Sequence, residues 1–287
     1  MWISRVAVDG RETHMTIFSR SHRSHRSIVR SLMLSLVLLV TGVAFACAAD
    51  APGKPKFGPH AISIQTSHDY LRGNDAPDYW ALSPFYVPQI TGSACSLATI
   101  ATVLNALMGL PPLGADTLVS QQSLLETVGI EDWAEKTAEK GEGLTFEEFK
   151  TYLSKSLDAY KIAADIEVLK PSDDSADTLE RIRRLLADNE RSGDDIVMAY
   201  FNQGVVTGDW DGPHLSPVGA YDAEQRRVLI MDVDRRFYVP YWTSDETLLE
   251  AMLRPAPADH GALAGQTGGL VRVILRGGAR GALRVPQ

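Results

Sequence analysis

Apolar residues recur every three to four positions through much of the chain after residue 90. Between 96 and 108 the apolar positions fit one face of a helix that ends at Gly109: Leu97, Ile100, Ala101, Leu104 and Leu107. The same spacing predicts helices over 117–127 and 175–190. A further helix is predicted to begin at Thr145, because Thr145-Phe-Glu-Glu148 is a capping-box sequence.

Later in the chain, short apolar runs separated by polar turns replace this helical spacing. They predict strands over 195–201, 214–221, 227–233 and 269–275, with one short helix over 243–253. Helices that precede a set of hairpin-connected strands are typical of the α+β class, and not of an alternating parallel-sheet fold. We therefore expect an N-terminal helical lobe and a C-terminal antiparallel β-sheet lobe.

Residues 1–49 have the three-part layout of a secretion signal. Four arginines between positions 20 and 30 precede an apolar run from Leu32 to Ala46, which is short for a membrane span. Ala44-Phe45-Ala46 suits signal cleavage, and Cys47 leaves open a lipid anchor instead. We expect a signal over 1–49, one catalytic domain over 50–287, and a periplasmic or secreted protein.

Composition narrows the classes of function. Without residues 1–49 the chain has 22 Lys and Arg against 34 Asp and Glu, a net charge of −12. A nucleic-acid binder needs a concentrated basic surface, so we expect no nucleic-acid partner. No Cys/His spacing suits zinc. The sequence leaves a homodimer as one option for the assembly.

Cys95 is the one cysteine that follows the signal segment. It comes after Gln89-Ile-Thr-Gly-Ser-Ala94, a turn-like stretch, and it stands at the predicted start of a helix. A helix start favours a thiolate and offers main-chain N–H groups to an oxyanion, which is what a cysteine nucleophile needs. Gln89 is a candidate second oxyanion donor. The alternative is a buried, unreactive thiol and an ordinary loop glutamine.

A cysteine nucleophile needs a histidine base, and four histidines follow the signal: His60, His68, His214 and His260. His214 opens an apolar strand after a Gly- and Asp-rich loop, so it is the candidate base. The other three are predicted to have surface or structural roles.

Strand alternation selects the acid that would orient His214. A hairpin turn centred near residue 223 places His214 opposite Asp232, and a two-residue slip places it opposite Asp234. Asp232 lies inside the apolar run and Asp234 at its exit, so Asp232 is preferred. A buried carboxylate there would need hydrogen bonds, which an imidazole N–H supplies.

The order Cys, His, Asp resembles papain-like enzymes, and the surrounding residues resemble the phytochelatin synthase family, especially its short bacterial type. The resemblance covers about residues 60–255 and rests on Gln89 with Cys95, Val103-Leu-Asn-Ala-Leu107, His214-Leu-Ser-Pro-Val-Gly-Ala-Tyr221, and Val228-Leu-Ile-Met-Asp-Val-Asp-Arg235-Arg-Phe-Tyr-Val-Pro240.

The resemblance implies a papain-like fold and a role for each matching residue. Cys95 would be the nucleophile, His214 the base, Asp232 its orienter and Gln89 the oxyanion donor, while Arg235 matches a family arginine and would bind substrate. Such acyltransferases cleave the Cys–Gly bond of glutathione through a γ-Glu-Cys acyl-enzyme and pass the acyl group to water or to a second glutathione. No bound cofactor is expected. Cadmium or zinc would enter as a thiolate complex of the acceptor, in metal detoxification.

The chain also departs from the family pattern. Ser96 stands where plant members tend to have glycine, Pro213 precedes His214, and no cysteine follows Asp232. The resemblance is therefore to the short type, in which hydrolysis tends to dominate. Two alternatives stay open: a papain-like peptidase with another peptide or cell-envelope substrate, and a non-catalytic thiol module that binds metal or a partner.

Overall fold

A seven-stranded sheet forms the centre of the fold in the computed structural model, which describes residues 55–277. The predicted signal over 1–49 lies outside the described residues. The strand order is β1-β6-β5-β4-β3-β7-β2, and every neighbouring pair is antiparallel. The strands are β1 Ile62–Ser63, β2 Ala164–Leu169, β3 Asp195–Asn202, β4 Pro213–Asp222, β5 Arg227–Ile230, β6 Tyr241–Ser244 and β7 Gly269–Leu275.

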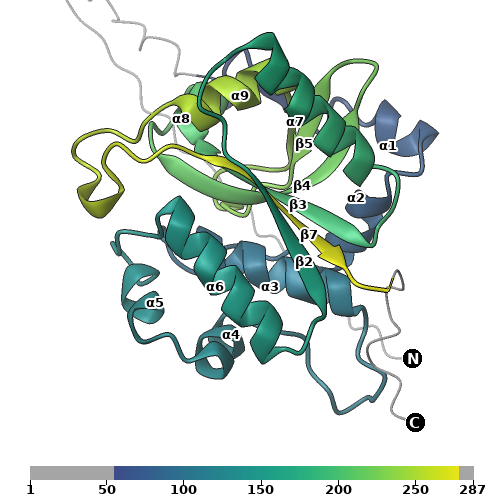
Figure 1. Ribbon diagram of the computed structural model, residues 1–287, viewed down its shortest axis with the longest axis vertical. Coiled ribbons are helices and arrows are strands. Elements are labelled where there is room, and N and C mark those ends of the chain that lie inside the picture. The colour runs from purple at the N-terminus through teal and green to yellow at the C-terminus, as the bar shows by residue number, and fades with distance from the viewer. Residues whose placement is uncertain (1–54, 278–287) are drawn as a thin grey trace, which may run out of the picture. The chain divides into compact units, whose positions relative to one another are not determined.

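Helices cover both faces of this sheet. Figure 1 shows α3 to α6 along one face and α7 and α9 across the other. The helices are α1 Asp69–Gly73, α2 Pro77–Leu82, α3 Cys95–Met108, α4 Gln121–Val128, α5 Glu131–Lys136, α6 Phe146–Ala159, α7 Ala176–Asn189, α8 Gln203–Thr207 and α9 Asp245–Leu253, and Ser83–Phe85 and Gly261–Leu263 are short 3₁₀ turns.

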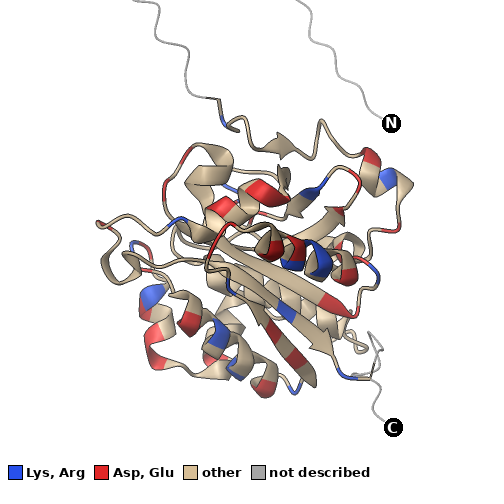
Figure 2. Cartoon of the chain, turned by 45° about the horizontal axis from the view of Figure 1, so that its top comes forward, with Lys and Arg blue, Asp and Glu red and all other residues tan. Residues whose placement is uncertain are grey.

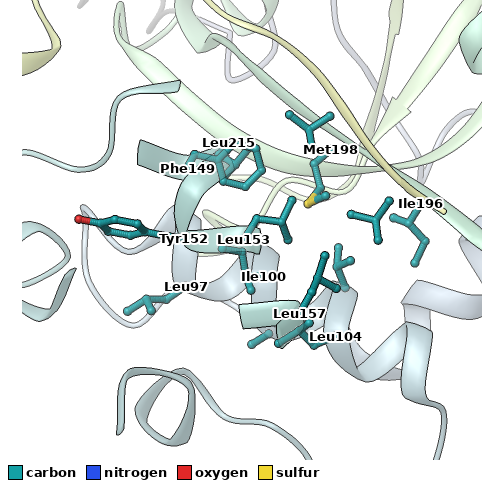
Figure 3. Close-up of a cluster of buried hydrophobic side chains, with 14 of the residues drawn as sticks. Leu97, Ile100, Leu104, Phe149, Tyr152, Leu153, Leu157, Ile196, Met198 and Leu215 are labelled. Atoms are coloured by element: carbon teal, nitrogen blue, oxygen red, sulfur yellow. The ribbon is translucent and has the colours of Figure 1, made fainter. Parts of the chain in front are cut away.

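β3 is buried along its whole length because it faces a core on each side. Ile196 and Met198 pack with α3 and α6, through Leu97, Ile100, Leu104, Phe149, Leu153 and Leu157 (Figure 3). The alternate residues Val197 and Phe201 face the second core, which α7 and α9 cover with Ile182, Leu186, Leu248 and Met252. A strand buried on both faces reads as a continuous apolar run, and this is the pattern of residues 195–201.

The α+β class is confirmed, and most predicted elements are present. The helix predicted over 96–108 is α3, and α6 begins at the predicted capping box, where the side chains of Thr145 and Glu148 each accept from the other residue's main-chain N–H. The helix predicted over 117–127 begins only at Gln121, because Ser120 caps it. The strand predicted over 227–233 ends at Ile230.

The helical and β-sheet parts of the chain are less separate than predicted. β2 lies between α6 and α7 in the sequence, was not predicted, and pairs with β7 at the edge of the sheet. The helical and β-sheet parts of the chain therefore share one sheet.

The predicted register of the β4–β5 hairpin is wrong. Asp222 pairs with Arg227 and Tyr221 with Val228, so the turn is centred later than residue 223. A register shift follows between Val218 and Ala220. Gly219 lies at this shift, where a Cβ would meet the Met231 side chain at 2.8 Å, so only glycine leaves room for Met231.

Basic and acidic residues are interspersed over the sheet and its helices in the view of Figure 2. One pair links the two helices on the same face: Arg183 of α7 donates to both carboxylate oxygens of Asp245 at 2.8 and 3.1 Å. Across residues 55–277 the structure contains no helix with the length and apolarity that a membrane span requires.

Candidate active site

Cys95 is the first residue of α3 and is partly exposed. The first N–H groups of a helix have no intrahelical partner, so they are available to a negatively charged group beside the thiol. The next residue, Ser96, is buried and accepts a 3.1 Å hydrogen bond from Trp133 Nε1. The serine that departs from the family pattern therefore joins the start of α3 to α5.

His214 lies in β4, beside α3. The Thr99 hydroxyl of α3 donates to the Leu215 carbonyl at 3.0 Å, which ties the helix to this strand. Pro213 is the first residue of β4, a position where a missing N–H costs no internal ladder bond. The second departure from the family pattern is thus accommodated at the strand end.

The His214 ring is held by a carboxylate. Its Nε2 atom lies 2.9 Å from Asp232 Oδ1 and 3.0 Å from Ser216 Oγ. A carboxylate can only accept, so Nε2 carries the proton and Nδ1 is left for the thiol. Both residues are buried, with 4% of His214 and none of Asp232 exposed. Asp232 contacts the ring from the loop after β5, and not from a paired strand position.

Asp232 is fully hydrogen-bonded in its buried position. Oδ2 accepts from Gln203 Nε2 at 2.7 Å and from the Tyr241 hydroxyl at 2.8 Å, and Oδ1 accepts from the Asp234 main-chain N–H at 2.9 Å. The Tyr86 hydroxyl donates to the main-chain oxygen of Asp232. A buried carboxylate with this many donors is stable as the anion.

The charges of the site support one another. Burial disfavours a charged imidazole, but the Asp232 carboxylate and the Cys95 sulfur outweigh this effect and raise the pKa of His214. Burial likewise disfavours the Asp232 anion, but the charge and hydrogen bonds of His214 lower the pKa of Asp232. The ring can therefore hold a proton taken from a thiol.

A cavity of about 360 Å³ lies directly beside the thiol. Cys95 and His214 both line it, so the predicted nucleophile and base share one solvent-accessible space. His260 also lines it, although it was predicted to have a surface or structural role. His260 reaches the cavity from the loop between α9 and β7. Its ring lies 5.6 Å from that of Trp210, centroid to centroid.

A second cavity, of about 300 Å³, lies on another side of His214. Its lining includes Gln89, Asp234, Phe237 and Tyr238, and it shares Gly92, Trp210 and His214 with the first cavity. Asp234, the alternative acid, therefore lines a cavity instead of orienting His214 through its side chain. Burial raises the pKa of Asp234.

Gln89 lies at the edge of the site. Its main-chain N–H donates to the Val233 carbonyl at 2.9 Å, and this bond fixes it next to the Asp232 loop. The side-chain Nε2 makes one long contact, 3.4 Å to the Gly92 carbonyl, and the buried Oε1 has no hydrogen-bond partner among residues 55–277. The amide is thus only weakly bound to the protein.

Arg235 is exposed, and its guanidinium lies over the Tyr86 ring at 4.8 Å from the centroid. Its neighbour in sequence, Asp234, lines the second cavity, but Arg235 itself lines neither cavity. Of the remaining histidines, His60 is exposed and His68 half-buried, and neither lines the two cavities. In residues 55–277 no three His, Cys, Asp or Glu side chains are grouped so that they could hold a metal ion.

The sequence is similar to one protein family and to two plant proteins. The family model described as phytochelatin synthase matches residues 64–261. Glutathione gamma-glutamylcysteinyltransferase 3 of Lotus japonicus is 27% identical over 184 residues, and glutathione gamma-glutamylcysteinyltransferase 1 of Arabidopsis thaliana is 26% identical over 202 residues. These matches cover 61% and 68% of this chain but only 34% and 39% of the plant proteins, so the chain matches well under half the length of either relative.

Proposed function

Because this chain belongs to the phytochelatin synthase family, we propose that it cleaves the Cys–Gly bond of glutathione through an acyl-enzyme on Cys95. The observation that carries the proposal is the shared cavity of Cys95 and His214, with His214 held by the buried Asp232 at 2.9 Å. Both plant relatives are named as glutathione acyltransferases.

In the first half-reaction the Cys95 sulfur attacks the carbonyl carbon of the Cys–Gly peptide bond. His214 holds the proton of the thiol and passes it to the glycine nitrogen as the carbon–nitrogen bond breaks. Glycine leaves, and a thioester joins γ-Glu-Cys to Cys95. The main-chain N–H at the start of α3 and the Gln89 amide donate to the oxyanion that forms on the way.

In the second half-reaction a nucleophile attacks the thioester carbonyl and His214 takes its proton. The carbon–sulfur bond then breaks, and the Cys95 sulfur leaves and recovers the proton that His214 holds. Water gives γ-Glu-Cys, and the amino group of a second glutathione gives (γ-Glu-Cys)₂-Gly. The cavity that Gln89 lines is placed to hold the leaving glycine or the incoming nucleophile, because it meets the first cavity at His214. How well this cavity excludes water sets the balance between hydrolysis and transfer.

The proposal also covers the role of the metal ion and the cellular location of the protein. Cadmium or zinc would enter as a thiolate complex of the acceptor glutathione, and therefore as part of a substrate. Residues 1–49 would direct export to the periplasm or beyond, with the anchor at Cys47 as the alternative.

The test is incubation of the purified protein with glutathione, with and without cadmium or zinc, and identification of products by mass spectrometry. We expect glycine together with γ-Glu-Cys, (γ-Glu-Cys)₂-Gly or both, and complete loss of turnover in Cys95→Ser. Ser154→Ala, an exposed substitution on α6 that lies outside both cavities, is the control and should leave turnover unchanged. If glutathione is not consumed at any metal level, the proposal fails and a peptidase with another substrate takes its place.

A further inference from the structure

We infer that the cavity beside Cys95 selects acyl donors that carry an ammonium group, which Glu142, His260 and Trp210 would hold. The inference rests on the proposed function only for the identity of the donor. For glutathione, the ammonium is the α-amino group of the γ-glutamyl end. A γ-glutamyl donor carries both an α-ammonium and an α-carboxylate, so the cavity can discriminate between two opposite charges.

The charged groups of the cavity wall are mainly acidic. Glu142 and Asp259 line it, and among the described residues that line it none is lysine or arginine. A donor carboxylate would therefore find no basic side chain other than the two histidines, whereas an ammonium would find two carboxylates. The cavity's net charge favours a cation.

His260 lines this space, with its Nδ1 atom turned to Asp259. Its Nδ1 atom lies 3.1 Å from Asp259 Oδ1, and because the carboxylate only accepts, Nδ1 is the donor. In the neutral ring Nε2 then has a lone pair and no proton, so it accepts from an ammonium. The half-exposed Trp210 ring lies beside His260 and also lines the cavity, so its π electrons can contribute to binding the same cation.

The two loops that form this wall are already held together. Gly261, with φ +52°, has no Cβ, and a Cβ there would lie 2.7 Å from Glu142 Oε1. The carboxylate of Glu142 therefore packs closely against the His260 loop. The Glu142 loop is itself anchored, because Tyr200 of β3 donates to the Leu144 carbonyl at 3.0 Å and Ser93 donates to the Gly141 carbonyl at 2.5 Å. These contacts hold the two loops in place before a donor binds, which lowers the ordering cost of binding.

The first test measures the charge of the cavity without any turnover. Cys95 is labelled with two methanethiosulfonates, one bearing trimethylammonium and the other sulfonate, and each rate is divided by that of free cysteine. We expect the cationic reagent to be favoured at least about fivefold at low salt, with the preference shrinking as salt rises. Glu142→Gln should reduce the preference. Glu126→Gln, an exposed acid on α4 outside the cavity, should leave it unchanged.

The second test uses donors that lack one charge. Glutaryl-Cys-Gly lacks the α-amino group, and 4-aminobutanoyl-Cys-Gly lacks the α-carboxylate. We expect kcat/KM to fall at least about tenfold, relative to glutathione, for the former and only a few-fold for the latter, since a charge-assisted hydrogen bond is lost only in the former. His260→Ala and Glu142→Gln should each bring the two analogues closer together.

Opposite results overturn the inference. Equal normalised labelling rates, a preference for sulfonate, or better turnover of glutaryl-Cys-Gly would show that the cavity does not select a cation. Absence of glutathione turnover together with cation-selective labelling would refute the proposed function instead, and would leave a different ammonium-bearing donor as the substrate.

Discussion

Asp232 Oδ1 lies 2.9 Å from His214 Nε2 although Asp232 lies beyond the end of β5. Its position therefore depends on side chains around it and not on strand pairing. Gln203 and Tyr241 hold its other oxygen, and Tyr86 holds its main-chain carbonyl. Groups from three separate parts of the chain thus fix Asp232 against the ring.

Asp232→Asn should lower kcat/KM by about 100-fold or more. The neutral amide no longer raises the pKa of His214, so the alkaline limb of the pH–rate profile, where His214 loses its proton, should move to lower pH. Thermal unfolding would show whether the variant folds. Asp234→Asn is the matched control, expected to lose less than about tenfold because only its main-chain N–H contacts Asp232. Equal losses in both variants would contradict the assignment.

Gln89→Ala should lower kcat by roughly 10- to 1000-fold and change KM little. An oxyanion donor acts mainly in the transition state, so its loss appears in kcat. Gln122→Ala, which removes an exposed glutamine of α4, should leave both constants unchanged. A rise in KM with constant kcat would mean that Gln89 binds the ground state instead.

Arg235→Ala should raise KM for glutathione by about tenfold if this arginine binds substrate. The Tyr86 ring contacts the face of the guanidinium and orients it. The N–H donors at the edge of the guanidinium can then bind a substrate. The neighbouring Arg236→Ala is also an exposed substitution and serves as the control. Steady-state kinetics that do not distinguish the two variants would remove Arg235 from the site.

Glu190→Gln should stabilise the protein at pH 8 but not at pH 4. Burial raises the pKa of Glu190 from 4.5 to about 7. Between these values the folded protein binds more protons than the unfolded chain, so stability falls as pH rises through the window. Glutamine does not ionise and can keep both contacts, with Tyr70 and with the Tyr221 N–H.

The expected gain at pH 8 is about 1 to 2 kcal/mol, allowing for the partial exposure of Glu190. Urea unfolding at both pH values measures it. The exposed Glu224, which lines a surface cavity together with Glu190, offers the control: Glu224→Gln should change stability little at either pH. A gain of equal size at pH 4 would mean that packing, and not ionisation, is responsible.

Local signals predicted much of the fold. The helical spacing of Leu97, Ile100 and Leu104 identified α3, because one face of that helix meets the sheet. The capping box at Thr145 located α6 to the residue. The predicted residues Cys95, His214 and Asp232 lie close together in the structure, and each follows or opens an element with a clear apolar pattern.

Long-range packing decided what the sequence could not predict. The Met231 side chain packs against Gly219 where the hairpin register shifts, a contact that neither strand pattern shows alone. His260 lies in a loop of small and polar residues without periodicity, and its approach to Cys95 depends on where that loop meets the Glu142 loop. β2 carried a signal that the prediction missed, because Asp165 and Glu167 alternate with Ile166 and Val168 in the period-two pattern of a half-buried strand.

The proposed nucleophile and its proposed base belong to different layers, with Cys95 on a helix and His214 on the sheet that this helix covers. The shared core of Leu97, Ile100 and Leu215 therefore acts as a spacer that sets the sulfur-to-ring distance. A core substitution that shifts α3 by a fraction of an ångström would therefore lower turnover before it lowers the fraction of folded protein. Turnover at the proposed site would thus be a sensitive measure of packing between helix and sheet.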